Sequence, residues 1–142
     1  MSDGAVKTIV QTRFIESWAR FSPNGEWIVY KSNESGVFEI YVQRFRDGAF
    51  KTRISTNGGE YPVWSRDGSK IYYTGPFNVV DISLRNGVRA APPRPIFERP
   101  PVLGPGEFTV FPDGHGVIGV GRKETTKSND IELLVDWGTA LP

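Results

Sequence analysis

The single histidine of this 142-residue sequence, His115, is the side chain best suited to acid–base chemistry at neutral pH. It lies close to Asp113, and a neighbouring carboxylate can tune the pKa of a histidine. A catalytic base, a charge-relay triad or a histidine-bound metal would depend on His115 alone, because the sequence has no cysteine and no Gly-x-Ser-x-Gly nucleophile motif. We therefore expect His115 to be an exposed turn residue, and we predict no catalytic residue, no metal site and no cofactor.

Residues 114–119 match the glycine pattern G-x-G-x-x-G of dinucleotide-binding proteins. That pattern holds a pyrophosphate only where it follows a strand and opens a helix, whose first amides bind the phosphates. Here the glycines belong to a turn that begins at Pro112 and leads into the apolar run 117–120. The match therefore indicates a β-hairpin and not a nucleotide site.

Four arginines surround a proline-rich stretch at residues 91–95: Arg85, Arg89, Arg94 and Arg99. A basic, proline-rich segment can serve as a polyproline ligand for another domain. The commoner role of such a segment is a long connection between two strands, because proline suits a sheet edge. We expect the second role.

Composition excludes several partners. The net charge is +1, which provides no electrostatic footprint for nucleic acid. No apolar run is long enough for a membrane helix, so no membrane partner is expected. Residues 1–4 lack the basic start and apolar centre of a secretory signal. We expect a cytoplasmic protein if Met1 is the native start, an expectation that fails if the sequence is an excised fragment.

One four-residue motif recurs three times, at residues 22–25 (SPNG), 65–68 (SRDG) and 111–114 (FPDG). The closing glycines are 43 and 46 residues apart, a period typical of the four-stranded blades of β-propellers. The Asn or Asp side chain can accept hydrogen bonds within its own turn, and glycine accepts the positive φ that closes a hairpin. The motif therefore predicts turns and not ligands.

Apolar, alternating stretches flank each turn, as expected of strands. Those before the turns are 18–21, 61–64 and 108–111, and those after are 27–30, 71–73 and 117–120. Further strands are expected at 37–42, 50–54, 79–84, 94–97 and 131–135, and one more precedes the first repeat at 6–11. No stretch shows sustained helical periodicity, so the sequence predicts an all-β fold.

The repeat resembles the aromatic-Ser-Pro-Asp-Gly signature of the TolB-like propeller family. Residues 18–30 (WARFSPNGEWIVY), 61–73 (YPVWSRDGSKIYY) and 39–42 (EIYV) carry the resemblance, which covers about residues 6–136. The third repeat departs from the signature at Val110 and Phe111. The resemblance implies one domain over 1–142 with three antiparallel four-stranded blades, at about 12–55, 56–98 and 99–136. It implies a scaffold and not one activity, because propellers host many functions.

A full ring of this family has six blades, so three blades form half a ring. Half a ring would expose apolar blade faces and a strand edge. We expect a homodimer in which residues 6–11 of one chain pair with residues 131–135 of the other, since two-fold dimers are the commonest oligomers. The alternative is an excised fragment of a larger propeller protein.

We expect a non-enzymatic module that binds a protein or a small ligand at the ring face or channel. That face comprises the loops entering the inner strands and the loops between second and third strands: 13–17, 32–36, 57–60, 99–106 and 123–129. The candidate binding residues at the channel mouth are Arg13, Glu16, Trp18, Arg20, Glu60, Tyr61 and Glu107. The alternative is a hydrolase or lyase in the channel acting on a small or sugar-like substrate. It would need convergent carboxylates or a metal, and the inner strands carry few ionisable groups besides Arg20 and Glu107.

Overall fold

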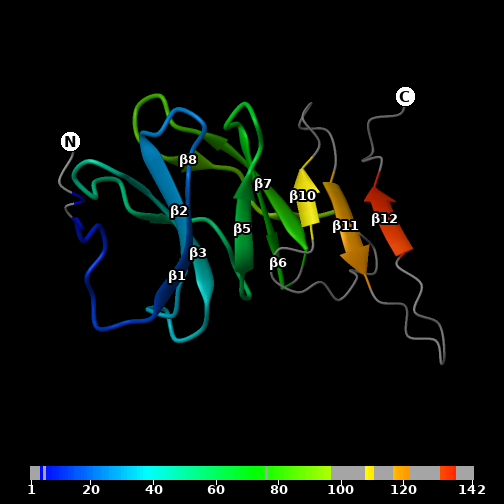
Figure 1. The fold of residues 1–142 in the computed structure, drawn as a ribbon, viewed down its shortest axis with the longest axis horizontal. Coiled ribbons are helices and arrows are strands. Elements are labelled where there is room, and N and C mark those ends of the chain that lie inside the picture. The colour runs from blue at the N-terminus through cyan, green and yellow to red at the C-terminus, as the bar shows by residue number, and fades with distance from the viewer. Residues whose placement is uncertain are drawn as a thin grey trace.

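The computed structural model describes residues 4, 6–75, 77–96, 108–110, 117–121 and 132–136. All regular structure in these residues is β-strand, as the sequence predicts, and the strands form three antiparallel sheets. The sheets lie side by side in chain order (Figure 1). None of the described segments is a helix capable of crossing a membrane.

The first two sheets are four-stranded blades with an additional short strand in the second. The first contains β1 (Glu16–Phe21), β2 (Trp27–Ser32), β3 (Glu39–Arg44) and β4 (Thr52–Arg53) in that order. The second contains β5 (Glu60–Trp64), β6 (Lys70–Thr74), β7 (Asn78–Ser83) and β8 (Arg89–Ala90), and β9 (Arg94–Pro95) also pairs with β7. The third contains β10 (Phe108–Val110), β11 (Val117–Gly121) and β12 (Glu132–Asp136).

The outermost strands are shorter than the sequence suggests. The strand predicted over 50–54 is reduced to Thr52–Arg53, because Phe50 has a φ of 58°, which is not an extended conformation. The strand predicted over 94–97 ends at Pro95, although the amide of Ile96 still donates to the carbonyl of Phe77 at 3.1 Å. The proline-rich arginine segment thus forms part of a sheet edge, as expected.

The repeated motif forms the predicted hairpin turns in the first two sheets. The hydroxyl of Ser22 donates to Asn24 Oδ1 at 2.7 Å and accepts from the amide of Trp27 at 3.0 Å. Ser65 donates to Asp67 Oδ1 at 2.7 Å in the same way. The turns close at glycines of positive φ, Gly25 at 71° and Gly68 at 73°. The third copy of the motif, with His115 after it, lies outside the described residues.

The core lies between neighbouring sheets. Ten buried residues form the cluster between the first and second sheets: Trp27, Val29, Ile40, Val42, Ile54, Trp64, Ile71, Tyr73, Val80 and Ile82. A second cluster joins the second sheet to the third and contains Tyr72, Phe77, Val79 and Phe108. Because successive residues of a strand point to opposite faces, β6 supplies Tyr73 to one cluster and Tyr72 to the other. Such face-to-face stacking is the blade arrangement of a propeller.

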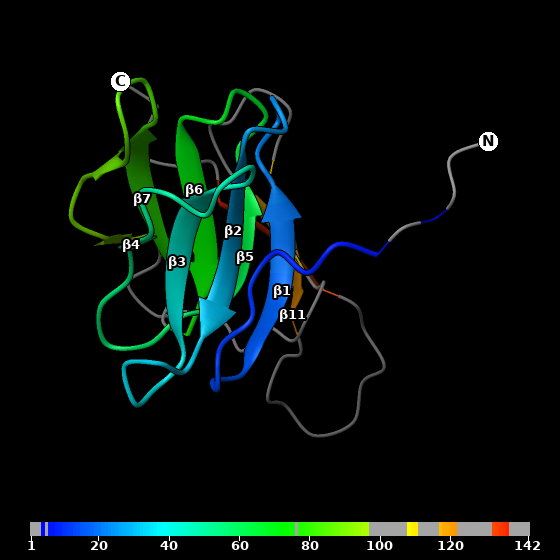
Figure 2. The same ribbon diagram turned by 90° about the vertical axis from the view of Figure 1, so that its left-hand side faces the viewer.

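The N-terminal segment, residues 6–11, forms no strand in this chain. It crosses the face of the first sheet that is turned away from the second sheet, in front of β1 in Figure 2. Val10 packs there against a small apolar cluster of Ile28, Tyr30 and Tyr41. Its predicted strand partner belongs to a second chain, so that pairing stays a prediction.

Candidate binding site at the entrance of the inner strands

The innermost strands of the three sheets, β1, β5 and β10, lie next to one another. The loop entering β1 is joined to the β2–β3 loop, because the amide of Ile15 donates to Asn33 Oδ1 at 2.9 Å. The loop entering β5 is joined to the first sheet through the amide of Gly59, which donates to the carbonyl of Phe38 at 2.8 Å. The described loops that the sequence assigned to one ring face therefore lie at one end of the sheets.

Two of the three inner strands, β1 and β5, are interrupted by an aromatic residue with left-handed backbone. Trp18 has a φ of 57° and Tyr61 a φ of 48°, and the strand register shifts at each. Bulky side chains seldom adopt this conformation, which costs energy and is found preferentially at binding and catalytic sites. The two residues occupy equivalent places in successive repeats, so the same bulge places an aromatic ring at the same position of each of these two blades.

The two rings meet. Trp18 and Tyr61 pack edge to face, with ring centroids 4.9 Å apart and planes at 85°. Both side chains are half-buried, so each ring keeps part of its surface open to solvent. The pair forms an aromatic platform between the first and second sheets.

A partly buried ion pair lies beside this platform. Lys31, at the end of β2, is only 8% exposed, and its ammonium pairs with the carboxylate of Glu60. Its Nζ also lies 4.4 Å from the ring centroid of Phe38 and 5.2 Å from that of Tyr61. A buried ammonium needs such partners, because burial without them would cost several kcal/mol, on the order of the desolvation of one ion.

Arg20 supplies a cation without a carboxylate partner. Its guanidinium carbon lies 5.7 Å from the ring centroid of Trp18, and Nη1 donates to the neighbouring carbonyl of Ala19 at 3.2 Å. Among the residues that the structure describes, no carboxylate lies within ion-pair distance of Arg20. The exposed guanidinium is therefore available to an anionic group.

Four of the predicted binding residues come together here: Trp18, Arg20, Glu60 and Tyr61. Two others interact with their own loop instead, since Arg13 stacks over the ring of Phe14 at 5.1 Å and Glu16 accepts from the hydroxyl of Thr12. Glu107 lies outside the described residues. We use the name entrance cluster for Trp18, Arg20, Lys31, Glu60 and Tyr61.

Sequence reasoning missed Lys31. The available signal was a lysine in the otherwise apolar run of β2, a residue type that is almost never fully buried unless paired. Its partner is 29 residues away in the next blade, so the pair could not be identified from local spacing.

The cluster offers aromatic surface, one exposed cation and one ion pair. In the described part of the chain no three His, Cys, Asp or Glu side chains gather as metal ligands would. Lys31 and Glu60 already neutralise each other, and the remaining members offer two aromatic rings and one guanidinium. Such groups recognise flat apolar surfaces and anions.

No family model and no curated protein matches the sequence. Among solved structures, TolB from Acinetobacter baumannii is similar at 22% identity and a TM-score of 0.58, over 94% of this chain and 32% of that protein. A protein from Agrobacterium tumefaciens assigned as TolB is 22% identical with a TM-score of 0.56, over 89% of this chain and 48% of its own.

A Bacteroides uniformis protein assigned as a 6-phosphogluconolactonase is a weaker match, at 20% identity and a TM-score of 0.49 over 81% of this chain and 34% of that one. The chain spans about a third to about a half of the length of these three proteins. At these identities the likeness concerns the fold alone. The three stacked antiparallel sheets and their two TolB neighbours show that this chain has the TolB-like β-propeller fold.

Proposed function

We propose that this chain is a non-enzymatic propeller scaffold that binds a protein or a small ligand through the entrance cluster. The observation that carries the proposal is the edge-to-face pair of Trp18 and Tyr61, held by the same strained bulge in two successive blades. Glycine would form the same bulge without strain. Two strained aromatic residues at equivalent positions therefore favour a role beyond the bulge itself, such as ligand binding.

The cluster suits a ligand that carries an anionic group next to a flat apolar one. Arg20 is exposed, has no carboxylate partner among the described residues and lies over the indole of Trp18. A guanidinium stacked on an aromatic ring keeps its N–H edge free to donate two parallel hydrogen bonds to a carboxylate or phosphate. The ring beside it accepts the apolar part of the same ligand.

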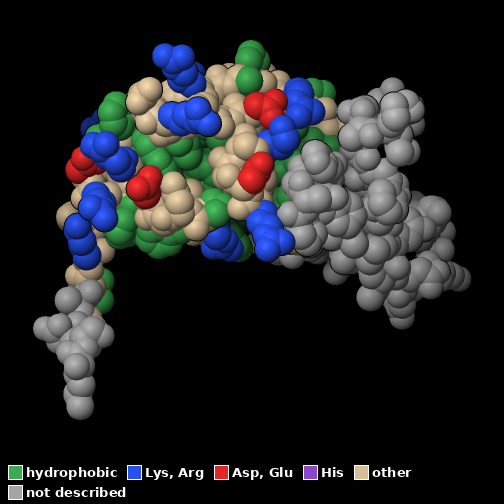
Figure 3. Space-filling model, turned by 90° about the horizontal axis from the view of Figure 1, so that it is seen from above, with side chains coloured by type: hydrophobic (Ala, Val, Ile, Leu, Met, Phe, Trp, Pro, Cys, Tyr) green, Lys and Arg blue, Asp and Glu red, His purple; other side chains and the backbone are tan. Residues whose placement is uncertain are grey.

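The described surface at the other end of the sheets shows no block of one charge. Figure 3, seen from above, shows the end that carries the β1–β2 and β5–β6 turns, opposite the entrance cluster, with Lys and Arg side chains spread over it and a few Asp and Glu among them. The net charge of the chain is only +1, which favours selective recognition by a few residues over binding through a broad basic patch.

Small anionic aromatics test the proposal directly. We would titrate phenylacetate into the protein and follow the four tryptophan indole N–H signals by NMR, with neutral phenylacetamide as the matched probe. We expect the Trp18 signal to shift with phenylacetate. Phenylacetamide should bind about fivefold or more weakly than phenylacetate, and the Arg20→Ala variant should bind phenylacetate about fivefold or more weakly than the original chain does.

The control variant is Arg53→Ala, which removes an exposed arginine from the short outer strand β4. It should leave the titration unchanged. The proposal would be contradicted if the Trp18 signal does not shift with phenylacetate, or if the Arg20→Ala variant binds phenylacetate as tightly as the original chain.

A further inference from the structure

The first sheet has buried residues on both of its faces. All six residues of β2 are buried, and so are the first five of β3. Trp27 and Val29 point into the core shared with the second sheet, whereas Ile28, Tyr30 and Tyr41 form a cluster on the opposite face. Strands buried on both sides are typical of sheets that lie between two other layers.

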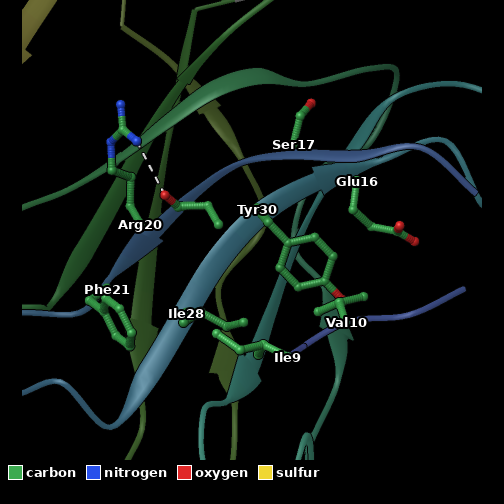
Figure 4. Close-up of a pocket in the computed structure, with 9 residues that line it drawn as sticks. Ile9, Val10, Glu16, Ser17, Arg20, Phe21, Ile28 and Tyr30 are labelled. Carbon is green, nitrogen blue, oxygen red and sulfur yellow. Dashed lines mark hydrogen bonds between the residues drawn. The ribbon is translucent and has the colours of Figure 1, made fainter. Parts of the chain in front are cut away.

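That opposite face, which we call the outer face, is covered in this chain by residues 6–11 and by the side chains of Phe45 and Lys51. Val10 is half-buried on the cluster, and Ile9 beside it remains 40% exposed. A cavity of about 180 Å³ lies between this segment and the sheet, lined mainly by apolar side chains that include Ile9, Val10, Ile28 and Phe21 (Figure 4). The pocket is partly open to solvent, so residues 6–11 cover this face only in part.

Exposed apolar residues border the outer face. Phe21 is 53% exposed although it lies at the end of β1, and it packs edge to face on Phe45 at 4.8 Å. Val6, at the start of the covering segment, is 97% exposed. The polar atom of the buried Tyr30 is satisfied within the sheet, because its hydroxyl donates to Gln43 Oε1 at 2.9 Å. An apolar partner can therefore approach without leaving this hydroxyl unpaired.

The third sheet offers an edge strand. In the sheet order β10–β11–β12, β12 lies at one edge of the described strands. The register of β11 and β12 pairs Ile118 with Val135 and Val120 with Leu133. An edge strand can pair with a strand that another chain adds to the sheet.

We infer that a second copy of this chain covers the outer face with its third sheet, and that residues 6–11 leave the face to pair with β12 of that copy. The contact would reproduce the stacking now seen between the first and second sheets. Each copy has one outer face and one third sheet, so two copies that each span half a ring can make both contacts at once and close as a two-fold dimer. The net charge of +1 per chain opposes this association very little.

Dimerisation would complete the binding site whatever ligand it takes. In one chain β1 has an inner-strand neighbour, β5, on one side. Docking of the other copy would bring that copy's β10 to the second side of β1, so that Trp18 and Arg20 would be flanked by inner strands on both sides. On this inference, a single chain contains only part of the binding site around the entrance cluster.

The first test is the mass in solution. Sedimentation velocity and light scattering at roughly 1 to 100 µM chain should give twice the 15.8 kDa of one chain, since dimer formation depends on concentration. A monomer throughout this range would overturn the inference. So would open-ended oligomers, because they would show that the contact does not close.

The second test uses a matched pair of charge insertions. Phe21→Glu places a carboxylate on the outer face and should raise the dimer dissociation constant about tenfold or more. Val37→Glu introduces the same charge at a loop residue that is 57% exposed and belongs neither to the apolar cluster nor to the pocket of that face, and it should leave dimerisation unchanged. Unfolding by urea checks that both variants are folded. Equal effects of the two substitutions would overturn the assigned face.

The third test addresses the exchanged segment. A chain lacking residues 1–11 should dimerise about tenfold or more weakly, because it loses the strand that pairs with β12. If the segment only covers its own outer face, its removal would uncover that face and the dimer would be as tight or tighter. That outcome would overturn the strand exchange.

Discussion

The indole of Trp18 and the phenol ring of Tyr61 meet edge to face 4.9 Å apart, although the two residues belong to different sheets. Each comes from the same place in its repeat, and each has left-handed backbone. The first two blades are therefore joined at their inner strands by a contact that the strained bulges make possible. The same contact presents two aromatic surfaces at the entrance, which connects the stability of the blade interface with the proposed binding.

Truncation of Tyr61 should weaken this interface. Tyr61→Ala removes the edge-to-face partner of Trp18 and the ring beside Lys31, and we expect a loss of about 1–2 kcal/mol in the free energy of unfolding. Tyr61→Phe keeps the ring and should cost much less. Urea unfolding followed by tryptophan fluorescence measures both, and similar losses for the two variants would show that the hydroxyl, and not the ring, carries the effect.

The ion pair between Lys31 and Glu60 should behave as a unit. Glu60→Gln leaves the buried ammonium of Lys31 without its counter-charge, and we expect a loss of about 1–2 kcal/mol, reduced from the cost in a dry interior because Glu60 is partly exposed. Adding Lys31→Met removes the unpaired charge and should restore most of the stability. A double-mutant cycle in urea measures the coupling, and strictly additive losses would contradict the interpretation.

Local patterns predicted the turns well, because their contacts are local. Ser22 and Asn24 lie two residues apart and hydrogen-bond each other, so four residues of sequence contain all the information. The bulges at Trp18 and Tyr61 were not predicted, because no glycine marks them and their backbone is fixed by packing across two sheets. The burial of Lys31 depends likewise on a residue of the next blade.

The covering segment shows a different limit of sequence reasoning. Residues 6–11 are expected to form a strand, yet in this chain they cross the outer face of the first sheet without pairing. A strand forms only where a sheet edge meets it, and its pattern does not say which edge that is. The outer strand predicted over 50–54 is shorter than expected for a related reason, since the left-handed φ of Phe50 cannot be inferred from a bulky apolar residue.

Glycine at position 59 should be required by the core. An added Cβ there would lie 2.6 Å from Cγ1 of the fully buried Ile40 and 3.1 Å from Oγ of Ser55. We expect Gly59→Ala to cost about 1–3 kcal/mol of unfolding free energy, the range of overpacked cores. Gly4→Ala is the matched control, because nothing lies near its added Cβ. Equal thermal midpoints of the two variants would contradict this packing.

The turn carboxylate of Asp67 should make stability depend on pH in acid. The amide and hydroxyl of Ser69 and the hydroxyl of Ser65 donate to it, and these hydrogen bonds lower the pKa of Asp67 to about 2. A lowered pKa in the folded state stabilises the fold above the ordinary value of 3.8, and that stabilisation is lost as the pH falls from 4 towards 2. Because Asp67 is exposed, we expect the loss to be on the order of 1 kcal/mol.

The first repeat suggests the control for this titration. Asn24 occupies the position of Asp67 and accepts the same kind of hydrogen bonds, including one from the amide of Glu26 at 3.1 Å. Asp67→Asn should therefore keep the turn while removing the titrating group, so that its unfolding free energy falls less between pH 4 and pH 2 than that of the original chain. Urea unfolding at several pH values measures the difference. Parallel pH profiles of the two proteins would mean that the hydrogen bonds at Asp67 do not discriminate between its charged and neutral forms. The acid sensitivity would then have to come from another carboxylate. Asp81 is one candidate, because its hydrogen bond with Lys70 is the chief cause of its lowered pKa.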